Sequence, residues 1–500
     1  MPTRRLLSLL PLLFPLLCAP QMHDHPAPEK LGTVSFPLTC SAAVQQPFNR
    51  AVSLLHSFAY TEARYAFHHV AQLDPQCAMA YWGVAISYYH PLWEGLAPSA
   101  VVPGQAAIQQ AIQLHSGSPR ELEFIRALSI IYTDGLPFGT RTLRYEHAMS
   151  TLAQGNPADV ESQVFYALAL LAVSPPTDKS HANQKQAMFI LEPLYRTHPD
   201  HPGLAHYIIH ACDNREMAQQ GLAAARAYAQ VAPSAPHALH MPSHIFTRLG
   251  LWQDSITSNI AARDAARRQG DLGEQLHAMD YLVYAYLQTG QNEQAADVIH
   301  QLQSELNTPS LDTQNFKIGY AATAMPIRYD IELHHWTDAA AIIPPSAAPP
   351  SVAAIAVWAR GLGLARSGHP NAAREQIVRL RELEAKLRSA GDDYWATQTS
   401  ILTRELEAWC AQAEHDSTEA ESLLRSAASE EDAVEKLPVT PGPILPAREQ
   451  LGSVLLEQNH PALALEAFQA ALQTTPGRRS ALQGAADAAR LSSDRKQVTK

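Results

Sequence analysis

The stretch ARYAFHHVAQLDP, residues 63–75, and the stretch ALEAFQAALQTTP, residues 464–476, have the same spacing near the two ends of the chain. Each holds an alanine, a phenylalanine and a closing proline: Ala63, Phe67 and Pro75 in the first, Ala464, Phe468 and Pro476 in the second. Residues four apart share one face of a helix, and proline cannot continue a helix. Each stretch therefore predicts the second helix of a helix-turn-helix unit. The pair Leu451 and Gly452 marks the helix before the second stretch.

Together, the Leu-Gly pair, the Ala-x3-Phe spacing and the closing proline resemble the tetratricopeptide-repeat signature, whose period is about 34 residues. The resemblance implies an all-α fold in which tetratricopeptide-like helix-turn-helix repeats form a right-handed superhelical solenoid. Stacked helical repeats present an extended concave surface, which such proteins use for binding. The expected role of the fold is therefore recognition of a protein or peptide.

The composition and net charge of the chain limit the classes of partner that it is expected to bind. The chain has 500 residues, of which 46% are hydrophobic, enough for a large core or several smaller cores in series. Its formal net charge is -11, and no basic stripe stands out. A nucleic-acid-binding chain normally carries a basic patch, so we expect no nucleic-acid partner.

The N-terminus has the pattern of an export signal. Arg4 and Arg5 precede an apolar run, residues 6–17, that is interrupted by prolines. A membrane-spanning helix needs about 20 apolar residues, so this run predicts a signal peptide over residues 1–19 rather than a transmembrane segment. We expect an exported protein, periplasmic or secreted, with no transmembrane segment. A lipid anchor at Cys18 is not favoured, because Leu17 is bulkier than such sites normally accept.

Four further cysteines follow Cys18, namely Cys40, Cys77, Cys212 and Cys410. Export permits disulfides, and Cys40 with Cys77 is the favoured pair because both lie near the mature N-terminus. Four buried free thiols are the alternative. No C-x-x-C motif occurs, so a thioredoxin-like or cysteine-rich zinc site is not indicated.

Proline-rich stretches divide the predicted helical array. After the signal peptide we expect a polar leader (20–46), an N-terminal array (47–340) with a histidine-rich centre (181–244), a proline-rich linker (341–352), further repeats (353–437), a proline-rich loop (438–446), a C-terminal repeat with its capping helix (447–491) and a polar tail (492–500). One continuous solenoid with a hinge near 340–352 and two separate domains both fit this pattern.

Histidines are concentrated in the centre of the chain, where eight of the 23 fall between residues 181 and 244. His206 and His210 are four apart on an apolar segment, so both imidazoles point to one side of a helix. His240 and His244 have the same spacing around Pro242, which is expected to begin a helix. Because equivalent helices of neighbouring repeats lie side by side, these four side chains are expected to converge on the groove.

Neutral imidazole is a common ligand of zinc, copper, nickel and iron. The spacing therefore predicts a divalent transition-metal site at His206, His210, His240 and His244, with His237 and Asp213 as additional ligands or as outer hydrogen-bonding groups. Two other interpretations remain. Histidines also cap helices and hydrogen-bond between packed helices, and they can contact a substrate directly.

The central sequence resembles a wider group. HPGLAHYIIH (201–210), PHALHMPSHIF (236–246) and FYALAL (165–170) resemble segments of exported bacterial tetratricopeptide-repeat proteins that have no established activity. The leading hypothesis is an exported solenoid that binds a protein or peptide in its concave groove, as a scaffold or assembly factor of the cell envelope. The alternative is a metalloprotein or metalloenzyme with a histidine centre in the groove.

Sequence motifs for particular reactions are missing. There is no glycine-rich phosphate loop, no Gly-x-Ser-x-Gly nucleophile elbow and no glutamate inside the His-x3-His pairs of the kind found in metalloproteases. No catalytic residue is predicted, and a non-enzymatic role is favoured.

Overall fold

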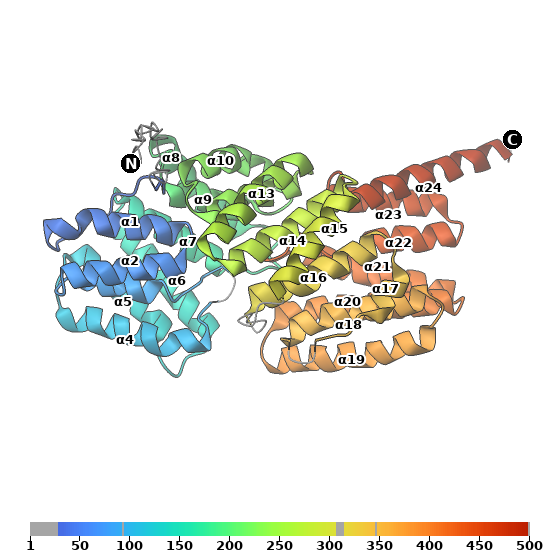
Figure 1. Ribbon diagram of the computed structural model, residues 1–500, viewed down its shortest axis with the longest axis horizontal. Coiled ribbons are helices and arrows are strands. Elements are labelled where there is room, and N and C mark those ends of the chain that lie inside the picture. The colour runs from blue at the N-terminus through green and yellow to red at the C-terminus, as the bar shows by residue number, and fades with distance from the viewer. Residues whose placement is uncertain (1–28, 93–94, 307–314, 346–347, 499–500) are drawn as a thin grey trace, which may run out of the picture.

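The computed structural model describes residues 29–92, 95–306, 315–345 and 348–498 (Figure 1). Helices follow one another throughout this part of the chain, and it contains no strand beyond an isolated bridge between His90 and Gly95. The predicted signal peptide and Cys18 lie outside the described residues. None of the described helices is both long and apolar enough to cross a membrane.

The N-terminal part consists of η1 (Ala42–Val44), α1 (Gln45–His56), α2 (Tyr60–Leu73), α3 (Ala78–Ile86), α4 (Pro98–Leu114), α5 (Pro119–Ser129), η2 (Ile130–Tyr132), α6 (Phe138–Gly155), α7 (Val160–Ala172) and α8 (Ala182–Thr197). The central part consists of α9 (Pro202–Cys212), α10 (Ala218–Val231), α11 (Pro236–His240), α12 (Pro242–Arg248), α13 (Trp252–Gln269), α14 (Leu272–Gln288), α15 (Asn292–Leu306), α16 (Phe316–Glu332) and α17 (Trp336–Ala341). The C-terminal part consists of α18 (Pro350–Arg366), α19 (Pro370–Ser389), α20 (Asp393–Ala413), α21 (Ser417–Ala433), α22 (Ala447–Glu457), α23 (Pro461–Thr474) and α24 (Arg479–Val498).

The repeat signature marks close contacts between paired helices. Gly452 of α22 faces Phe468 of α23 so closely that a Cβ atom would lie 2.8 Å from ring atoms. Gly83 of α3 faces Phe67 of α2 in the same manner. A side chain at either glycine would push the two helices apart, which explains the small residue beside each phenylalanine. Ala63, Ala464 and Leu451 are buried in the same contacts, while Pro75 and Pro476 follow the ends of α2 and α23.

The helices stack along the chain as an all-α solenoid, which confirms the predicted fold class. Each helix packs on the next, and alternate helices also touch, as α14 does with α16 and α18 does with α20. Figure 1 shows this progression from α1 at one end, through α9 to α14, to α18 and α20 at the other.

The C-terminal part folds back onto the centre of the solenoid. The C-terminal helix α24 contacts α14. The predicted proline-rich loop connects α21 to α22, and its carbonyls at Pro438 and Thr440 accept hydrogen bonds from the Tyr281 hydroxyl, at 3.0 and 3.1 Å. Just before this loop, the Lys436 ammonium lies 3.0 Å from the Asp213 carboxylate. A segment distant in sequence therefore covers the histidine-rich centre.

The Cys40–Cys77 disulfide is present, which confirms the favoured pairing, and Cys212 and Cys410 are buried free thiols. It joins the N-terminal leader to the junction between α2 and α3, across 37 residues. A cross-link of this kind typically stabilises a fold by about 3 kcal/mol.

Candidate metal centre

His206 and His210 stand one turn apart on α9. This helix begins at Pro202, which suits a first helical position, and the His201 side chain caps it by accepting the Leu204 backbone N–H. Both imidazoles turn their Nε2 atoms toward each other, and these atoms are 3.0 Å apart. Two nitrogen ligands at about 2.0–2.1 Å from a tetrahedral zinc would be separated by about 3.3 Å. The spacing is therefore close to that of two ligands of one ion.

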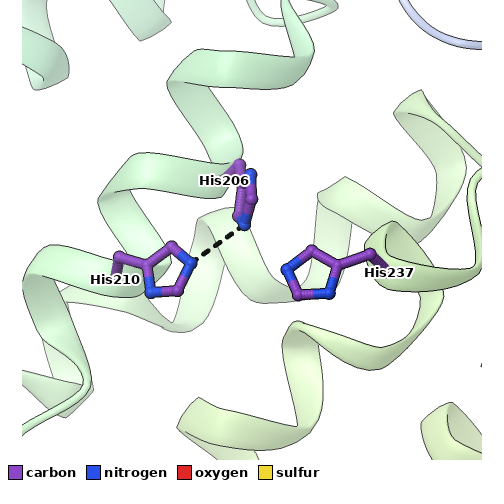
Figure 2. A group of neighbouring side chains, drawn as sticks. All are labelled: His206, His210 and His237. Carbon is purple, nitrogen blue, oxygen red and sulfur yellow. Dashed lines mark hydrogen bonds between the residues drawn. The ribbon is translucent and has the colours of Figure 1, made fainter. Parts of the chain in front are cut away.

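A third imidazole completes this group. His237, on the short helix α11, offers a ring nitrogen so that one ligand atom from each of His206, His210 and His237 lies within 4.8 Å of the others. Figure 2 shows the three rings arranged around a common point, with His237 approaching from the opposite side to His210. We call His206, His210 and His237 the first triad.

The next repeat builds a second group of the same kind. His240 ends α11, His244 lies in the first turn of α12, and their Nε2 atoms are again 3.0 Å apart. His277 on α14 brings its ring centroid to 4.3 Å from that of His240. One ligand atom from each of these residues lies within 4.8 Å of the others. We call His240, His244 and His277 the second triad.

The opposite ring nitrogens of four triad histidines are held by oxygen acceptors. Nδ1 of His206 lies 2.6 Å from the His56 carbonyl oxygen, and Nδ1 of His240 lies 2.7 Å from the Asn259 amide oxygen. Nδ1 of His237 and of His244 contacts the carboxylates of Glu274 and Asp213, at 3.2 and 2.9 Å. Each Nδ1 must carry the hydrogen in these bonds, so each Nε2 carries a lone pair. Acceptors behind histidine ligands orient the rings in the same way in metal proteins.

In the pair formed by His240 and His244, two ring nitrogens that both lack a hydrogen face each other. Both Nε2 atoms carry lone pairs, so no hydrogen bond joins them at 3.0 Å. Two lone pairs this close repel each other unless a positive centre attracts both. A proton is a poor candidate, because burial lowers the pKa of His244 to about 4 and holds that of His240 well below its usual value. A metal ion bound by both atoms satisfies the geometry.

The imidazole rings of the two triads are buried and uncharged. Burial also holds the pKa of His206, His210 and His277 well below the usual value. Their rings are therefore neutral at neutral pH, which is the form that binds metals. The triad side chains lie in the interior of the helical array, with at most 9% exposure.

Ionised carboxylates support the two triads from behind. Burial by itself would raise the pKa of Asp213, but Lys436 and Arg248 hold it well below its usual range. Burial would likewise raise the pKa of Glu274, but Lys317 and His237 hold that pKa well below its usual range. Both carboxylates remain charged, and cations already balance them.

Phe58 forms an apolar wall of the first triad. Its ring centroid lies 4.4 Å from that of His206, and it stacks on His210 and His237 at 5.6 and 5.4 Å. The residue adopts a left-handed backbone conformation, with φ of 53°, which is strained for a bulky side chain. Strained residues of this kind are held by their surroundings and gather at functional sites.

A third cluster near the triads has a different character. Glu161 on α7 accepts hydrogen bonds from Nε2 of His56 at 2.9 Å and of His201 at 3.0 Å. The remaining Nδ1 atoms are occupied as well, by the Tyr207 hydroxyl and the Leu204 backbone N–H. His201 and His56 hold the pKa of Glu161 below its usual value, although burial opposes this. All four nitrogens are committed, so this cluster is a structural network that joins α1, α7 and α9.

We expect Glu161→Gln to destabilise the protein by about 2–3 kcal/mol, because a neutral amide cannot accept from two imidazole N–H groups as a carboxylate does. Metal content should stay unchanged. Urea unfolding and elemental analysis measure the two effects, and the exposed Glu123→Gln is the matched control. Loss of metal in Glu161→Gln without loss of stability would contradict the structural role.

The four predicted histidines are close together but divide between two groups. His206 and His210 belong to the first triad with His237, and His240 and His244 to the second, while Asp213 binds His244 from behind. His277, Glu274, Asn259 and Phe58 were absent from the predicted site. The sequence does contain a signal that the histidine pair occurs twice. His240 follows His206 by 34 residues and His244 follows His210 by 34 residues, which is one tetratricopeptide period.

Comparison with known proteins gives matches among solved structures at low sequence identity. No protein-family model and no curated protein matches the chain. Among solved structures, the TPR domain of P58(IPK) aligns at 14% identity over 91% of this chain and 99% of its own, with a TM-score of 0.23. Human IFIT1 aligns at 11% identity over 85% and 88%, with a TM-score of 0.34. The Cut9–Hcn1 assembly aligns at 11% identity over 88% and 95%, with a TM-score of 0.28.

The repeated glycine-to-phenylalanine contacts and the ordered stacking of helix pairs define the architecture of the described residues. The described residues form an all-α solenoid of helix-turn-helix repeats. In this solenoid the triads come from equivalent helices of consecutive repeats, since α9 contacts α12 and α11 contacts α14. The repeat thus explains why one ligand pattern occurs twice.

Proposed function

We propose that the protein binds transition-metal ions at the first and second triads. The observation that carries this proposal is the pair of opposed Nε2 atoms in His240 and His244, each with its other nitrogen bonded to an oxygen acceptor. No hydrogen-bond donor among the described residues satisfies either lone pair in that contact, whereas a bound cation satisfies both. The first triad supports the proposal through the same 3.0 Å separation.

The ligand sets favour an open site over a closed structural one. A structural zinc site normally has four protein ligands, whereas catalytic sites use three and leave a position for water or substrate. Among the residues that the structure describes, each triad supplies three imidazoles. We therefore infer a metalloprotein whose ions accept a further ligand.

Export remains part of the proposal. Disulfides persist in oxidising compartments, so the Cys40–Cys77 bond supports a periplasmic or secreted protein. The N-terminal signal pattern of the sequence agrees with this location.

Elemental analysis of the protein purified from its export compartment tests the metal proposal. We expect near-stoichiometric transition metal, removal by a strong chelator, and recovery when the stripped protein is incubated with zinc or copper salts. His68→Gln/His69→Gln is the control, because these two exposed histidines lie outside both triads. Protein that carries no metal and takes up none after stripping would refute metal binding.

Peptide binding is the second candidate function, and a cavity favours it. A space of about 700 Å³ lies beside α20, α21 and the proline-rich loop. Tyr320, Tyr394 and Trp395 line it together with charged groups of both signs, such as Glu431 and Arg448. Aromatic rings flanked by charges suit an extended peptide. Isothermal titration with candidate peptides, repeated on Trp395→Ala, tests this function independently of metal content.

A further inference from the structure

One face of α20 runs along the cavity that is the candidate site for peptide binding. Tyr394 and Trp395 in the first turn of the helix, then Gln398 and Leu402, and finally Glu405 all line this space. They recur at intervals of three or four residues, so they form one stripe along the helix. From Tyr394 to Glu405 the stripe is about 16 Å long, at about 1.5 Å per residue. Aromatic rings therefore line one end of the stripe, and a carboxyl group lines the other.

A second carboxyl group faces the cavity from the next helix. Glu431 lies near the C-terminal end of α21, which packs against α20, and it lines the same space. Glu405 is almost fully buried, with 1% exposure, and its Oε2 atom has no hydrogen-bond partner among the described residues. One oxygen of Glu431 accepts the Ala447 backbone N–H at 2.9 Å. We call Glu405 and Glu431 the acidic end of the cavity.

The acidic end has no cation of its own, unlike the buried carboxylate of Asp213, which is paired with Arg248. Among the ion pairs that the described residues form, none includes a member of the acidic end. Arg448 also lines the cavity, but Asp432 holds its guanidinium, with Nε 2.6 Å from the carboxylate. A buried carboxylate without a cation is unfavourable, so the acidic end favours a positively charged ligand.

Protons occupy the acidic end in place of a cation. Burial raises the pKa of Glu405 well above its usual value, and the charge of Glu431 raises it further. The neighbouring Gln450 and Trp358 side chains oppose this shift, but they carry no charge that could balance a carboxylate. Burial also raises the pKa of Glu431 to about 7. A bound ammonium or guanidinium group would take the place of the proton on Glu405 and release it to water.

We propose that the acidic end receives the side chain of a lysine or arginine that belongs to an extended peptide bound in the cavity. The proposal rests on the second candidate function, peptide binding, and adds the chemistry of the ligand to it. An extended chain advances about 3.3 Å per residue, so about five residues fit along the stripe. Tyr394 and Trp395 then contact the other end of the peptide. A free amine would share the ammonium group but would leave most of that length empty.

The first measurement compares two pools of pentapeptides, blocked at both ends, by equilibrium dialysis against the purified protein. Every peptide of one pool contains a single lysine at a varied position, and the other pool has norleucine there, which lacks the ammonium group. We expect the lysine pool to bind at least about tenfold more tightly. Equal binding of the pools would overturn the acidic end as a recognition site and leave peptide binding intact, whereas no binding of either pool would overturn both. Binding of n-pentylammonium as tight as that of the lysine pool would overturn the choice of a peptide.

The second measurement repeats the dialysis on Glu405→Gln. Glutamine has nearly the shape of a protonated glutamate, so the packing of α20 is kept, but it cannot become an anion. The affinity for the lysine pool should fall about tenfold, to the level of the norleucine pool on the wild type. Glu419→Gln is the control, because Glu419 is exposed on α21, and it should bind the lysine pool as the wild type does. If Glu405→Gln kept the full preference for lysine, this carboxyl would have no part in recognition and the proposal would fail.

Discussion

Replacing His240 and His244 together by asparagine should abolish metal binding at the second triad, with a loss of affinity of more than about 100-fold. Changes to groups behind a metal ligand already cost about 10–100-fold, and here two ligand atoms disappear. Asparagine is chosen because its amide N–H replaces the Nδ1–H that contacts Asn259 and Asp213. The variant therefore loses Nε2 and keeps the bonds that fix the helix.

The stability of the metal-free double variant should be equal to or higher than that of the metal-free wild type, because the repulsion between the two Nε2 lone pairs is removed. Competition titration and thermal unfolding of both proteins check these expectations, with His68→Gln/His69→Gln as the matched histidine control. Unchanged metal affinity in the double variant would place the metal elsewhere in the chain. A large loss of stability would instead indicate that the two imidazoles serve packing.

Replacing Arg478 by methionine should destabilise the C-terminal repeats by about 3–5 kcal/mol, the usual cost of removing one partner of a buried ion pair. Arg478 is fully buried between α23 and α24. Its guanidinium contacts the Glu449 carboxylate at 2.6 Å and the Glu332 carboxylate at 2.5 Å. Methionine fills similar space and leaves two carboxylates buried without their cation.

This arginine also joins distant parts of the chain, because Glu332 lies on α16 and Glu449 on α22. Urea unfolding, together with limited proteolysis of α24, would measure the loss. Arg490→Met is the control, since Arg490 stands on α24, which begins one residue after Arg478, and has an exposed side chain and a surface partner, Asp487. Equal stability of the two variants would show that the buried contacts do not hold the C-terminal helices in place.

Local spacing predicted much of the fold. The alanine, phenylalanine and glycine of the last repeat meet in one helix-helix contact, and Pro242 begins α12 as expected. Such features depend on neighbours within about one repeat, where helix periodicity fixes which side chains face each other. The His-x3-His pairs belong to the same class, because a single helical turn brings Nε2 of His206 to Nε2 of His210.

Contacts between repeats were harder to foresee. His237 joins the pair His206 and His210, and His277 joins the pair His240 and His244. These placements depend on the short length of α11 and on its contact with α14, and neither feature follows from spacing within one helix. The network of His56, Glu161 and His201 has contacts that span 105 and 40 positions of the chain, and each of these residues alone has no distinctive pattern.

The sequence by itself determined the all-α repeat architecture and the two histidine pairs, because period, helix face and helix ends are local properties of a chain. Only the tertiary structure decided that the histidines form two triads, that oxygen acceptors direct every bonded Nδ1 away from the centre, and that Lys436 returns to Asp213. These contacts depend on how consecutive repeats pack and on where the C-terminal part folds back. Packing across the solenoid fixes both, and residue spacing along the chain does not encode it.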